Sequence, residues 1–150
     1  MAETYVIDAS VAFKWHVDDE EAIQEARQLL RDYGDGKIAI MAPKLFLVEI
    51  GNAFNVAVMR TRLEEENALT DFQEILELDI PLIEYTDFLL SAWKFARAHN
   101  RSVYDSVYVV TAQHLDCGFY TGDKRLYNAL RDKIPLIKWI GDYGKQRTKE

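Results

Sequence analysis

The sequence predicts an α/β fold in which a mostly parallel sheet of about four to five strands is covered by helices on both faces. Short apolar segments alternate with longer amphipathic segments along the chain, and turn residues fall between them. Of the 150 residues, 49% are hydrophobic, which is enough for one core. We therefore expect a single domain over residues 1–150, with a polar, frayed tail from about residue 143.

The first half of the chain is expected to alternate between strand and helix. The predicted elements are a strand over residues 5–8 with a helical turn after it, a helix within 18–36, a strand over 37–43, and helices over 43–61 and 64–78. The acidic residues of the helix within 18–36 lie at its N-terminal end, as the helix dipole favours. Pro43 ends the preceding strand and is placed in the first turn of the next helix.

The second half continues the same alternation. The predicted elements are a strand over 82–85, helices over 88–100 and 104–118, a strand over 119–123, a helix over 123–133 and a strand over 135–140. Thr86 or Asp87 is expected to cap the first of these helices. The segment 104–118 has strand-like composition, but its apolar residues repeat at helical spacing, and Gly118 stands where a helix would stop.

The composition limits the classes of function. The formal net charge of −7 argues against a protein that grips nucleic acid through a broad basic face, so a nucleic-acid partner would need metal ions or a local basic rim. The single cysteine, Cys117, cannot form an internal disulfide. No secretory signal or membrane-spanning segment is recognisable. We expect a cytoplasmic protein that does not contact a membrane.

Three aspartates stand where the loops of a parallel sheet converge. Asp8 closes the first strand, Asp123 closes the strand over 119–123, and Asp105 begins a helix. In open parallel sheets, sites form at the carboxyl ends of the strands, where helix N-termini also point. The three carboxylates are therefore expected to converge.

Glu49 is a fourth acidic candidate, for a different reason. It lies on an apolar stripe of its helix, among Leu45, Phe46, Ala53 and other residues of the same face. A buried ionised carboxylate without a partner costs several kcal/mol, so Glu49 needs a cation, a hydrogen-bond network or an edge position near water. Asn52, one turn later, could hydrogen-bond to Glu49 or to a bound ligand.

Each acidic residue also has an ordinary explanation, and these interpretations remain open. Asp105 and Asp123 could simply cap helices, and Asp8 could accept backbone donors of the helix that follows it. Glu49 could pair with an arginine such as Arg60 or Arg62. The functional interpretation gains weight because all four ordinary explanations would have to hold together.

Clustered carboxylates repel one another and persist when a multivalent cation offsets the repulsion. A site made only of oxygen ligands suits Mg²⁺ or Mn²⁺. The three histidines and Cys117 show no spacing typical of zinc ligands. We predict that His114 packs against a helix and that His16 is a surface or loop residue.

Three blocks of the sequence, taken in order, resemble the PIN-domain ribonucleases, and within them the small VapC-like toxins of toxin-antitoxin pairs. The blocks are "VIDASVAFKW", "LFLVEIGNAF" and "YDSVYVVTAQHLDCGFYTGDKRLYNAL". This resemblance spans most of the chain. It implies a three-layer α/β/α domain whose acidic residues bind Mg²⁺ or Mn²⁺ and hydrolyse the phosphodiester backbone of RNA. The residues that match the acidic positions are Asp8, Glu49, Asp105 and Asp123.

The resemblance also implies accessory residues and partners. Ser10 matches a small hydroxyl residue that can orient the first carboxylate, and Asn52 matches a polar position after the glutamate. The implied protein partner is an antitoxin whose segment wraps the domain and offers an arginine to the acidic site. Residues 54–59 and 72–78 are predicted to form a homodimer face.

Basic and aromatic residues near these blocks are candidates for substrate contacts. Lys14, Lys124 and Arg125 could contact flanking phosphates, or they could be solvated surface charges. Trp15 could face a partner or substrate, or anchor its helix to the core. Three tyrosines are assigned to packing: Tyr104, Tyr108 and Tyr120.

The hypothesis is hydrolysis assisted by metal, in which a bound water with a lowered pKa is the nucleophile. A phosphotransfer or phosphatase domain with Asp8 as the nucleophile is the alternative enzyme, although Ser10 stands where such domains place a second acid. An inactive PIN-like module that only binds a protein partner is the alternative without catalysis.

Overall fold

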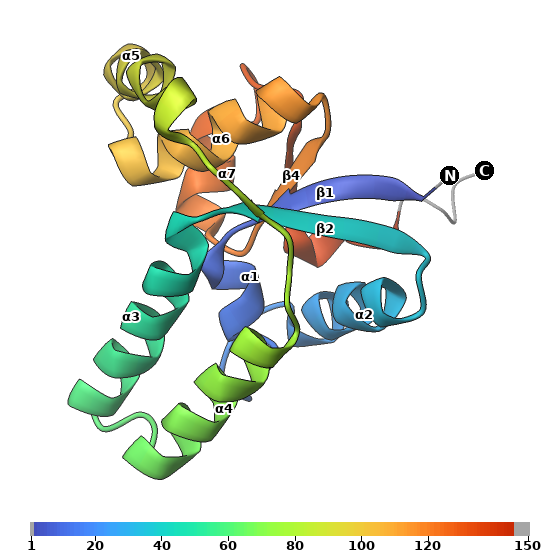
Figure 1. Ribbon diagram of the computed structural model, residues 1–150, viewed down its shortest axis with the longest axis vertical. Coiled ribbons are helices and arrows are strands. Elements are labelled where there is room, and N and C mark those ends of the chain that lie inside the picture. The colour runs from blue at the N-terminus through green and yellow to red at the C-terminus, as the bar shows by residue number, and fades with distance from the viewer. Residues whose placement is uncertain (1, 146–150) are drawn as a thin grey trace.

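The computed structural model describes residues 2–145 and contains a five-stranded sheet in which every neighbouring pair of strands is parallel (Figure 1). The order of the strands across the sheet is β3-β2-β1-β4-β5. Their bounds are Glu3–Ile7 (β1), Ile38–Pro43 (β2), Leu82–Ile83 (β3), Gly118–Thr121 (β4) and Ile137–Trp139 (β5). The predicted parallel α/β sheet is confirmed.

Helices cover both faces of this sheet, which gives the molecule three layers (Figure 1). The α-helices are Ala9–Phe13 (α1), Ile23–Gly34 (α2), Leu45–Met59 (α3), Glu65–Glu77 (α4), Leu89–His99 (α5), Val103–Leu115 (α6) and Lys124–Leu130 (α7). Two short 3₁₀ helices are added at Thr86–Phe88 (η1) and Ile140–Asp142 (η2). Within residues 2–145, no helix has the length and apolar character needed to cross a membrane.

The chain reverses its direction across the sheet between β1 and β4. It runs outward from β1 to β2 and β3, and then crosses back to β4 and β5 on the other side of β1. The register pairs Ile7 with Tyr120, so β1 and β4 end next to each other. A topological switch point of this kind opens a crevice at the carboxyl ends of the two strands.

The central helix α6 explains why a segment of strand-like composition is helical. Seven consecutive residues from Ser106 to Ala112 are buried, and the helix contacts β1, β2 and β4. A helix that is apolar on all sides belongs inside a protein, and burial against the sheet outweighs the strand preference of valine and tyrosine. Ser102 begins this helix by accepting a hydrogen bond from the backbone amide of Asp105 at 3.0 Å.

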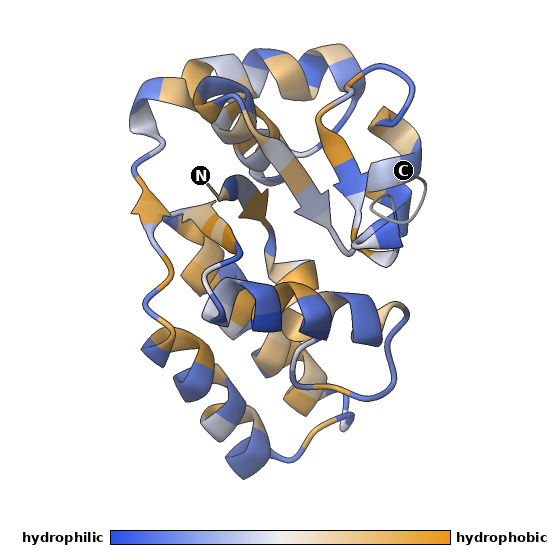
Figure 2. Ribbon diagram, turned by 90° about the vertical axis from the view of Figure 1, so that its right-hand side faces the viewer, coloured by the Kyte–Doolittle hydropathy of each residue, from blue (hydrophilic) through white to orange (hydrophobic). Residues whose placement is uncertain are grey.

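Helices α3 and α4 run side by side as a hairpin that extends away from the sheet (Figure 1). Hydrophobic and hydrophilic residues alternate along the helices of the molecule, as Figure 2 shows. Phe54 and Phe72 hold the hairpin together, with 6.3 Å between their ring centroids. At Gly51, a Cβ atom would lie only 2.9 Å from the Phe72 ring, so a larger residue at this position would push the ring away.

Three boundary predictions are wrong for local reasons. Pro43 is the last residue of β2 and precedes α3 instead of lying in its first turn. Neither Thr86 nor Asp87 caps α5, because both lie in η1, and the Thr86 hydroxyl donates to Glu84 instead. Asp116, in the left-handed region at φ 53°, ends α6, whereas Gly118 already begins β4.

The predicted start of a frayed tail at about residue 143 is also wrong. Tyr143 is only 5% exposed, and its hydroxyl donates to Asp32 Oδ2 at 2.6 Å. Its ring also packs edge-on against Tyr120, with 5.4 Å between the centroids. The packed domain therefore includes residue 143, and the rest of the predicted tail from 146 onward lies outside the described residues.

Candidate active site

The four predicted acidic residues line one cavity of about 540 Å³ at the switch point of the sheet. Asp8 follows β1, Glu49 lies on α3, Asp105 lies in the first turn of α6, and Asp123 precedes α7. The volume falls in the range of pockets that bind small ligands, about 300–1,000 Å³. The remaining lining residues are Ala9, Ser10, Val48, Asn52, Ala53, Tyr104 and Tyr108. Four segments far apart in the sequence therefore bring carboxylates to one place.

Asp8 is the most firmly held of the four. Its Oδ1 accepts from the Ser10 hydroxyl at 2.5 Å and from the Val11 amide at 3.3 Å, and its Oδ2 accepts from the Thr121 hydroxyl at 2.6 Å. Burial raises the pKa of Asp8 to about 6, although these hydrogen bonds favour the charged form. Asp8 does accept a donor at the start of α1, as the ordinary interpretation expected, and it also faces the cavity.

A small network of hydroxyl groups fastens the end of β4 to the start of α1. The amide of Gly122 donates to Ser10 Oγ at 2.8 Å, and the amide of Asp123 donates to Thr121 Oγ1 at 3.0 Å. At Gly122, a Cβ atom would lie 2.8 Å from the carbonyl oxygen of Ser10. The network therefore sets the position of Asp123 relative to Asp8 and depends on the absence of a side chain at residue 122.

Glu49 takes its hydrogen bond from a residue that the sequence did not indicate. The hydroxyl of Tyr108 on α6 donates to Glu49 Oε1 at 2.6 Å. Burial, and then repulsion from Asp105, raise the pKa of Glu49, while the tyrosine hydrogen bond opposes the shift. The proposed pairing with Arg62 is wrong, because Arg62 binds Asp19 and Glu20 at 3.0 and 3.2 Å.

Asp105 is the common neighbour of the other carboxylates. Burial raises its pKa, and repulsion from Asp123 adds to the shift. Repulsion from Asp105 in turn raises the pKa of both Asp8 and Glu49. The capping explanation of Asp105 is wrong, because the cap of α6 is the Ser102 side chain.

Asp123 both caps a helix and lines the cavity, so the capping and the functional interpretation apply to it together. Its Oδ1 caps α7 by accepting from the amides of Arg125 and Leu126 at 3.0 and 3.2 Å. The same side chain is exposed and lines the mouth of the cavity. Capping therefore fixes the carboxylate at the cavity without removing it from the candidate site.

The donor set of this cavity fits a hard divalent cation. The four acidic side chains are all carboxylates, three of them are at least partly buried, and burial, with a smaller contribution from mutual repulsion, raises three pKa values. A cation bound among them would remove that repulsion. Oxygen-only ligand sets of this kind suit Mg²⁺ or Mn²⁺. Asp8, Glu49, Asp105 and Asp123 are the residues that would hold the ion.

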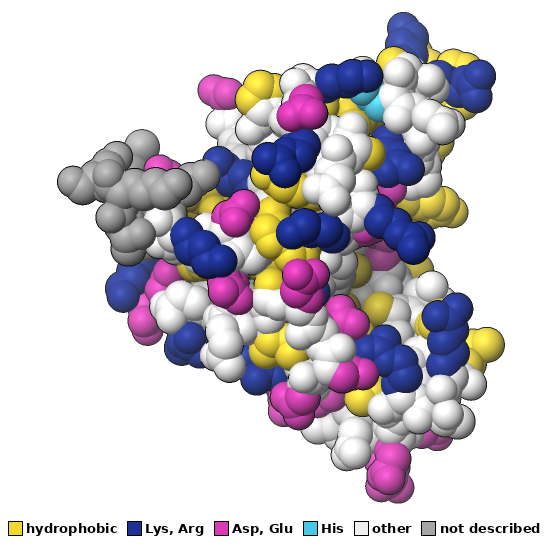
Figure 3. Space-filling view, turned by 180° about the vertical axis from the view of Figure 1, so that it is seen from behind, with side chains coloured by type: hydrophobic (Ala, Val, Ile, Leu, Met, Phe, Trp, Pro, Cys, Tyr) yellow, Lys and Arg dark blue, Asp and Glu magenta, His cyan; other side chains and the backbone are white. Residues whose placement is uncertain are grey.

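The predicted basic rim is only partly present. Lys14 is just 2% exposed, and its Nζ donates to the carbonyl of Glu21 at 2.7 Å and lies 3.4 Å from Glu20. Its assignment to phosphate contacts, or to solvated surface, is therefore wrong. Lys124 and Arg125 are exposed at the start of α7. Figure 3 shows basic and acidic side chains interspersed on one face of the molecule.

The predictions for the aromatic residues are also only partly correct. Trp15 is an anchor, because it is buried and its Nε1 donates to the carbonyl of Ala26 at 2.9 Å. Tyr108 and Tyr120 are buried as predicted, whereas Tyr104 is 64% exposed at the cavity and does not pack in the core. His114 packs on Phe88 as predicted, with 4.2 Å between the ring centroids.

Sequence reasoning did not identify two contributors to the site, the side chain of Thr121 and the hydroxyl group of Tyr108. Thr121 is the last residue of β4 and has a fully buried hydroxyl that is bonded to Asp8. A threonine at the end of a buried strand, two places before an acidic residue, is a signal that could have identified it. Asn52, in contrast, was predicted and is found among the lining residues.

Comparison with known proteins agrees with this arrangement. Residues 5–131 match the family model of the PIN domain. The chain is 36% identical over 106 residues to the protein named Ribonuclease VapC1 in two strains of Mycobacterium tuberculosis, CDC 1551 / Oshkosh and H37Rv. The match covers 65% of this chain and 74% of each relative. The crystal structure of PAE2754 from Pyrobaculum aerophilum superposes with a TM-score of 0.70 at 19% identity, over 100% of both chains.

Proposed function

The chain belongs to the PIN domain family, and from this premise we propose that it is a metal-dependent endoribonuclease, the toxin component of a toxin-antitoxin pair. The observation that carries the proposal is the convergence of Asp8, Glu49, Asp105 and Asp123 on one cavity. The 36% identity to proteins named as ribonucleases supports RNA as the substrate. We expect the enzyme to act in the cytoplasm and to use Mg²⁺ or Mn²⁺.

The proposed reaction is the attack of water on a phosphodiester, with cleavage of a P–O bond of the RNA backbone. A bound dication would lower the pKa of the attacking water and offset the charge that builds on the phosphate oxygens. Asp8 is held by Ser10, Thr121 and the Val11 amide, so it keeps a fixed orientation toward the cavity. Glu49, positioned by Tyr108, would help to hold the dication and orient the attacking water; the proton of the water is released to solvent, and the leaving oxygen takes up a proton as the P–O bond breaks.

The exposed residues around the cavity provide the proposed substrate contacts. Lys124 and Arg125 follow Asp123 directly and would contact phosphates that flank the scissile bond. Tyr104, one position before Asp105, presents an exposed ring at the cavity on which an unpaired base could stack. The net charge of −7 makes this affinity modest and sensitive to salt.

Two features favour hydrolysis assisted by metal over a phosphorylated Asp8. Both carboxylate oxygens of Asp8 already accept hydrogen bonds from side chains of the protein. Ser10, which lies two places after Asp8, serves as a donor to it and not as an acid. We therefore expect that no aspartyl-phosphate can be trapped at Asp8 when the protein is incubated with phosphate donors.

The proposed protein partner is an antitoxin segment that covers the cavity and inserts an arginine among the carboxylates. Val48, 76% exposed beside Glu49, and the exposed ring of Tyr104 would give such a segment apolar contacts. A homodimer through α3 and α4 is also proposed, although Phe54 is buried inside the hairpin and cannot contribute to it. Met59 and Leu76 are exposed and could contribute to this dimer face.

The test is cleavage of labelled RNA by the purified protein in Mn²⁺ or Mg²⁺, beside a chelator control and the Asp8→Asn variant. Asp132→Asn is a matched control, because it makes the same chemical change at an exposed residue outside the cavity. We expect the chelator and Asp8→Asn to abolish cleavage and Asp132→Asn to leave it unchanged. Equal cleavage in all samples would reveal a contaminating nuclease and remove the proposal.

A further inference from the structure

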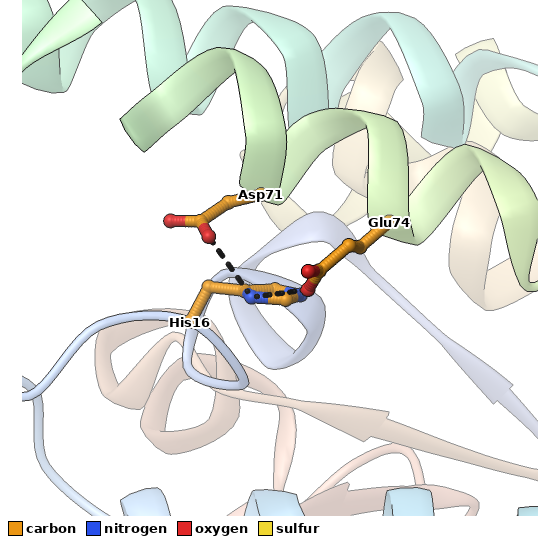
Figure 4. Close-up of side chains that lie close together, drawn as sticks. All are labelled: His16, Asp71 and Glu74. Atoms are coloured by element: carbon orange, nitrogen blue, oxygen red, sulfur yellow. Dashed lines mark ion pairs between the residues drawn. The ribbon is translucent and has the colours of Figure 1, made fainter. Parts of the chain in front are cut away.

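A second cluster of possible metal ligands lies outside the acidic cavity, where the turn after α1 meets α4. The Nδ1 atom of His16 lies 3.4 Å from Asp71 Oδ1 and 3.5 Å from Glu74 Oε2 (Figure 4). The three ligand atoms all lie within 4.8 Å of one another. None of these residues lines the acidic cavity.

The two distances from His16 match the spacing of ligands around a shared ion. Ligands bonded to one tetrahedral zinc at about 2.0–2.1 Å lie about 3.3–3.4 Å apart. Both distances from His16 Nδ1 agree with this value. They exceed the range of about 2.7–3.2 Å that is typical of N–H···O hydrogen bonds. The imidazole nitrogen is thus placed between two carboxylates at nearly equal distance, with a close hydrogen bond to neither.

The surroundings also allow an ion to enter and the ligands to adjust. The side chains of His16 and Asp71 are 17% and 22% exposed, and that of Glu74 is 57% exposed. The side chains of His16 and Asp71 are largely enclosed, whereas the exposed glutamate can rotate to complete the coordination. Asp71 and Glu74 are three positions apart on α4, so both project from the same side of the helix. Figure 4 shows both carboxylates directed at the imidazole.

We propose that His16, Asp71 and Glu74 form a binding site for a transition-metal dication, with zinc as the best match, and that water fills the fourth position. One imidazole and two carboxylates are ligands that Zn²⁺ accepts, and a tetrahedral set with three protein ligands leaves an open position. The bound ion fastens the turn after α1 to the α3–α4 hairpin. Because Asp8 caps the N-terminus of α1, the site steadies the helix that directly follows this carboxylate of the acidic cavity.

His16 lies in the turn after α1, as predicted for a surface or loop residue, and the proposal adds a ligand role at this position. The sequence concealed it because His16 and its two partners are separated by more than fifty residues and meet only when α4 folds against the turn after α1. No short zinc-binding motif is present in that arrangement. The proposal does not depend on the ribonuclease assignment, because it involves no residue of the cavity.

The test is titration of the full chain with Zn²⁺ alone, followed by calorimetry, in an Asp105→Asn background that weakens metal binding at the acidic cavity. Glu74→Gln is the primary variant, because its exposed side chain can be changed without disturbing the core. Glu77→Gln is the matched control, an exposed glutamate of the same helix outside the cluster. Replacement of Zn²⁺ by Co²⁺ reports the coordination number through its visible absorption.

We expect one equivalent of Zn²⁺ to bind, with affinity reduced at least about tenfold by Glu74→Gln and unchanged by Glu77→Gln. The Co²⁺ form should show the intense bands of four- or five-coordinate cobalt. Asp71→Asn should reduce affinity in the same way. Absence of binding, equal affinity in the two glutamate variants, or the weak spectrum of six-coordinate Co²⁺ would overturn the proposal and leave His16 as a side chain that only contacts two carboxylates.

Discussion

The hydroxyl of Tyr108 reaches from the central helix to Glu49 on α3 and donates a hydrogen bond of 2.6 Å. Tyr108 is almost fully buried and stacks on Phe119, with 5.7 Å between the ring centroids. Burial raises the pKa of Tyr108 far above its usual range, so the phenol keeps its proton and remains a donor. One side chain thus belongs both to the hydrophobic core and to the wall of the acidic cavity.

Replacing Tyr108 with phenylalanine should separate these two roles. The ring would keep its stacking position, but Glu49 would lose a hydrogen bond to a charged group, a contact that contributes about 1.5–3 kcal/mol. We expect cleavage of RNA to fall about tenfold or more while the far-ultraviolet circular dichroism remains unchanged. A pH profile should show the pKa of Glu49 shifted further upward, since the bond that lowers it is gone. If the rate of RNA cleavage and the pH profile were unchanged, Tyr108 would not be a residue that positions Glu49.

The stability of the metal-free protein should fall as the pH rises from about 4 to about 6. The pKa of Asp8 is about 6 in the folded protein and 3.8 in the unfolded chain. In this pH window the folded protein therefore still carries a proton on Asp8, whereas the unfolded chain has lost it. The folded state therefore binds more protons, and the slope is up to about 1.4 kcal/mol per pH unit. Urea denaturation in a chelator at several pH values measures the slope.

The Asp8→Asn variant should flatten this dependence, because the amide does not titrate. Added Mn²⁺ should raise the melting temperature of the unmodified protein at pH 7, since an ion that binds only the folded state stabilises it. The increase should be much smaller in Asp8→Asn. A pH slope that is the same in both proteins would assign the effect to other groups.

Two buried threonines should respond in opposite directions to the same substitution. Thr121→Val removes the donor to Asp8 Oδ2 and the acceptor of the Asp123 amide, and we expect a loss of about 1–3 kcal/mol in the free energy of unfolding. Thr111 is equally buried, but among the described residues its hydroxyl has no hydrogen-bond partner. Thr111→Val should therefore be neutral or stabilise by about 1 kcal/mol. Denaturant titration of the two variants side by side provides the comparison.

The Gly122→Ala substitution adds only one methyl group, but it should strongly reduce RNA cleavage. The added methyl group would lie 2.8 Å from the carbonyl oxygen of Ser10 and 2.6 Å from Lys14 Cε, and backbone on one side cannot move away easily. We expect the Gly122–Ser10 hydrogen bond to lengthen and Asp123 to shift from its place at the cavity. RNA cleavage should fall by about a hundredfold, as misplacement by about 1 Å does in other enzymes. Gly34→Ala, where no atom lies within 4 Å of the new Cβ, is the matched control.

The sequence was informative about features that depend on nearby residues. Strands end and helices begin at local signals, so the local sequence around Asp8 and Asp123 was sufficient to place both residues at the carboxyl edge of the sheet. The apolar neighbours of Glu49 likewise indicated that it needs a partner. These signals, together with the resemblance to PIN domains, were sufficient for the fold and for the four acidic residues.

Features that depend on partners distant in sequence were not accessible in the same way. Tyr108 and Glu49 are 59 positions apart, and no spacing rule joins them. Lys14 has the composition of a surface residue, but the fold encloses it beside Glu20 and the carbonyl of Glu21. Thr86, Asp87 and Gly118 all have suitable chemistry for caps, and the chain used other residues because η1 and β4 occupy those positions.

The bond between Asp8 and Thr121 joins residues 113 positions apart, which bears on when the protein becomes active during its synthesis. A nascent chain that has not yet emerged beyond β4 lacks Thr121, Asp123 and the neighbour that β1 needs on one side. Closing so long a loop is also a slow step in folding. Translation must therefore be almost complete before the acidic cavity can assemble.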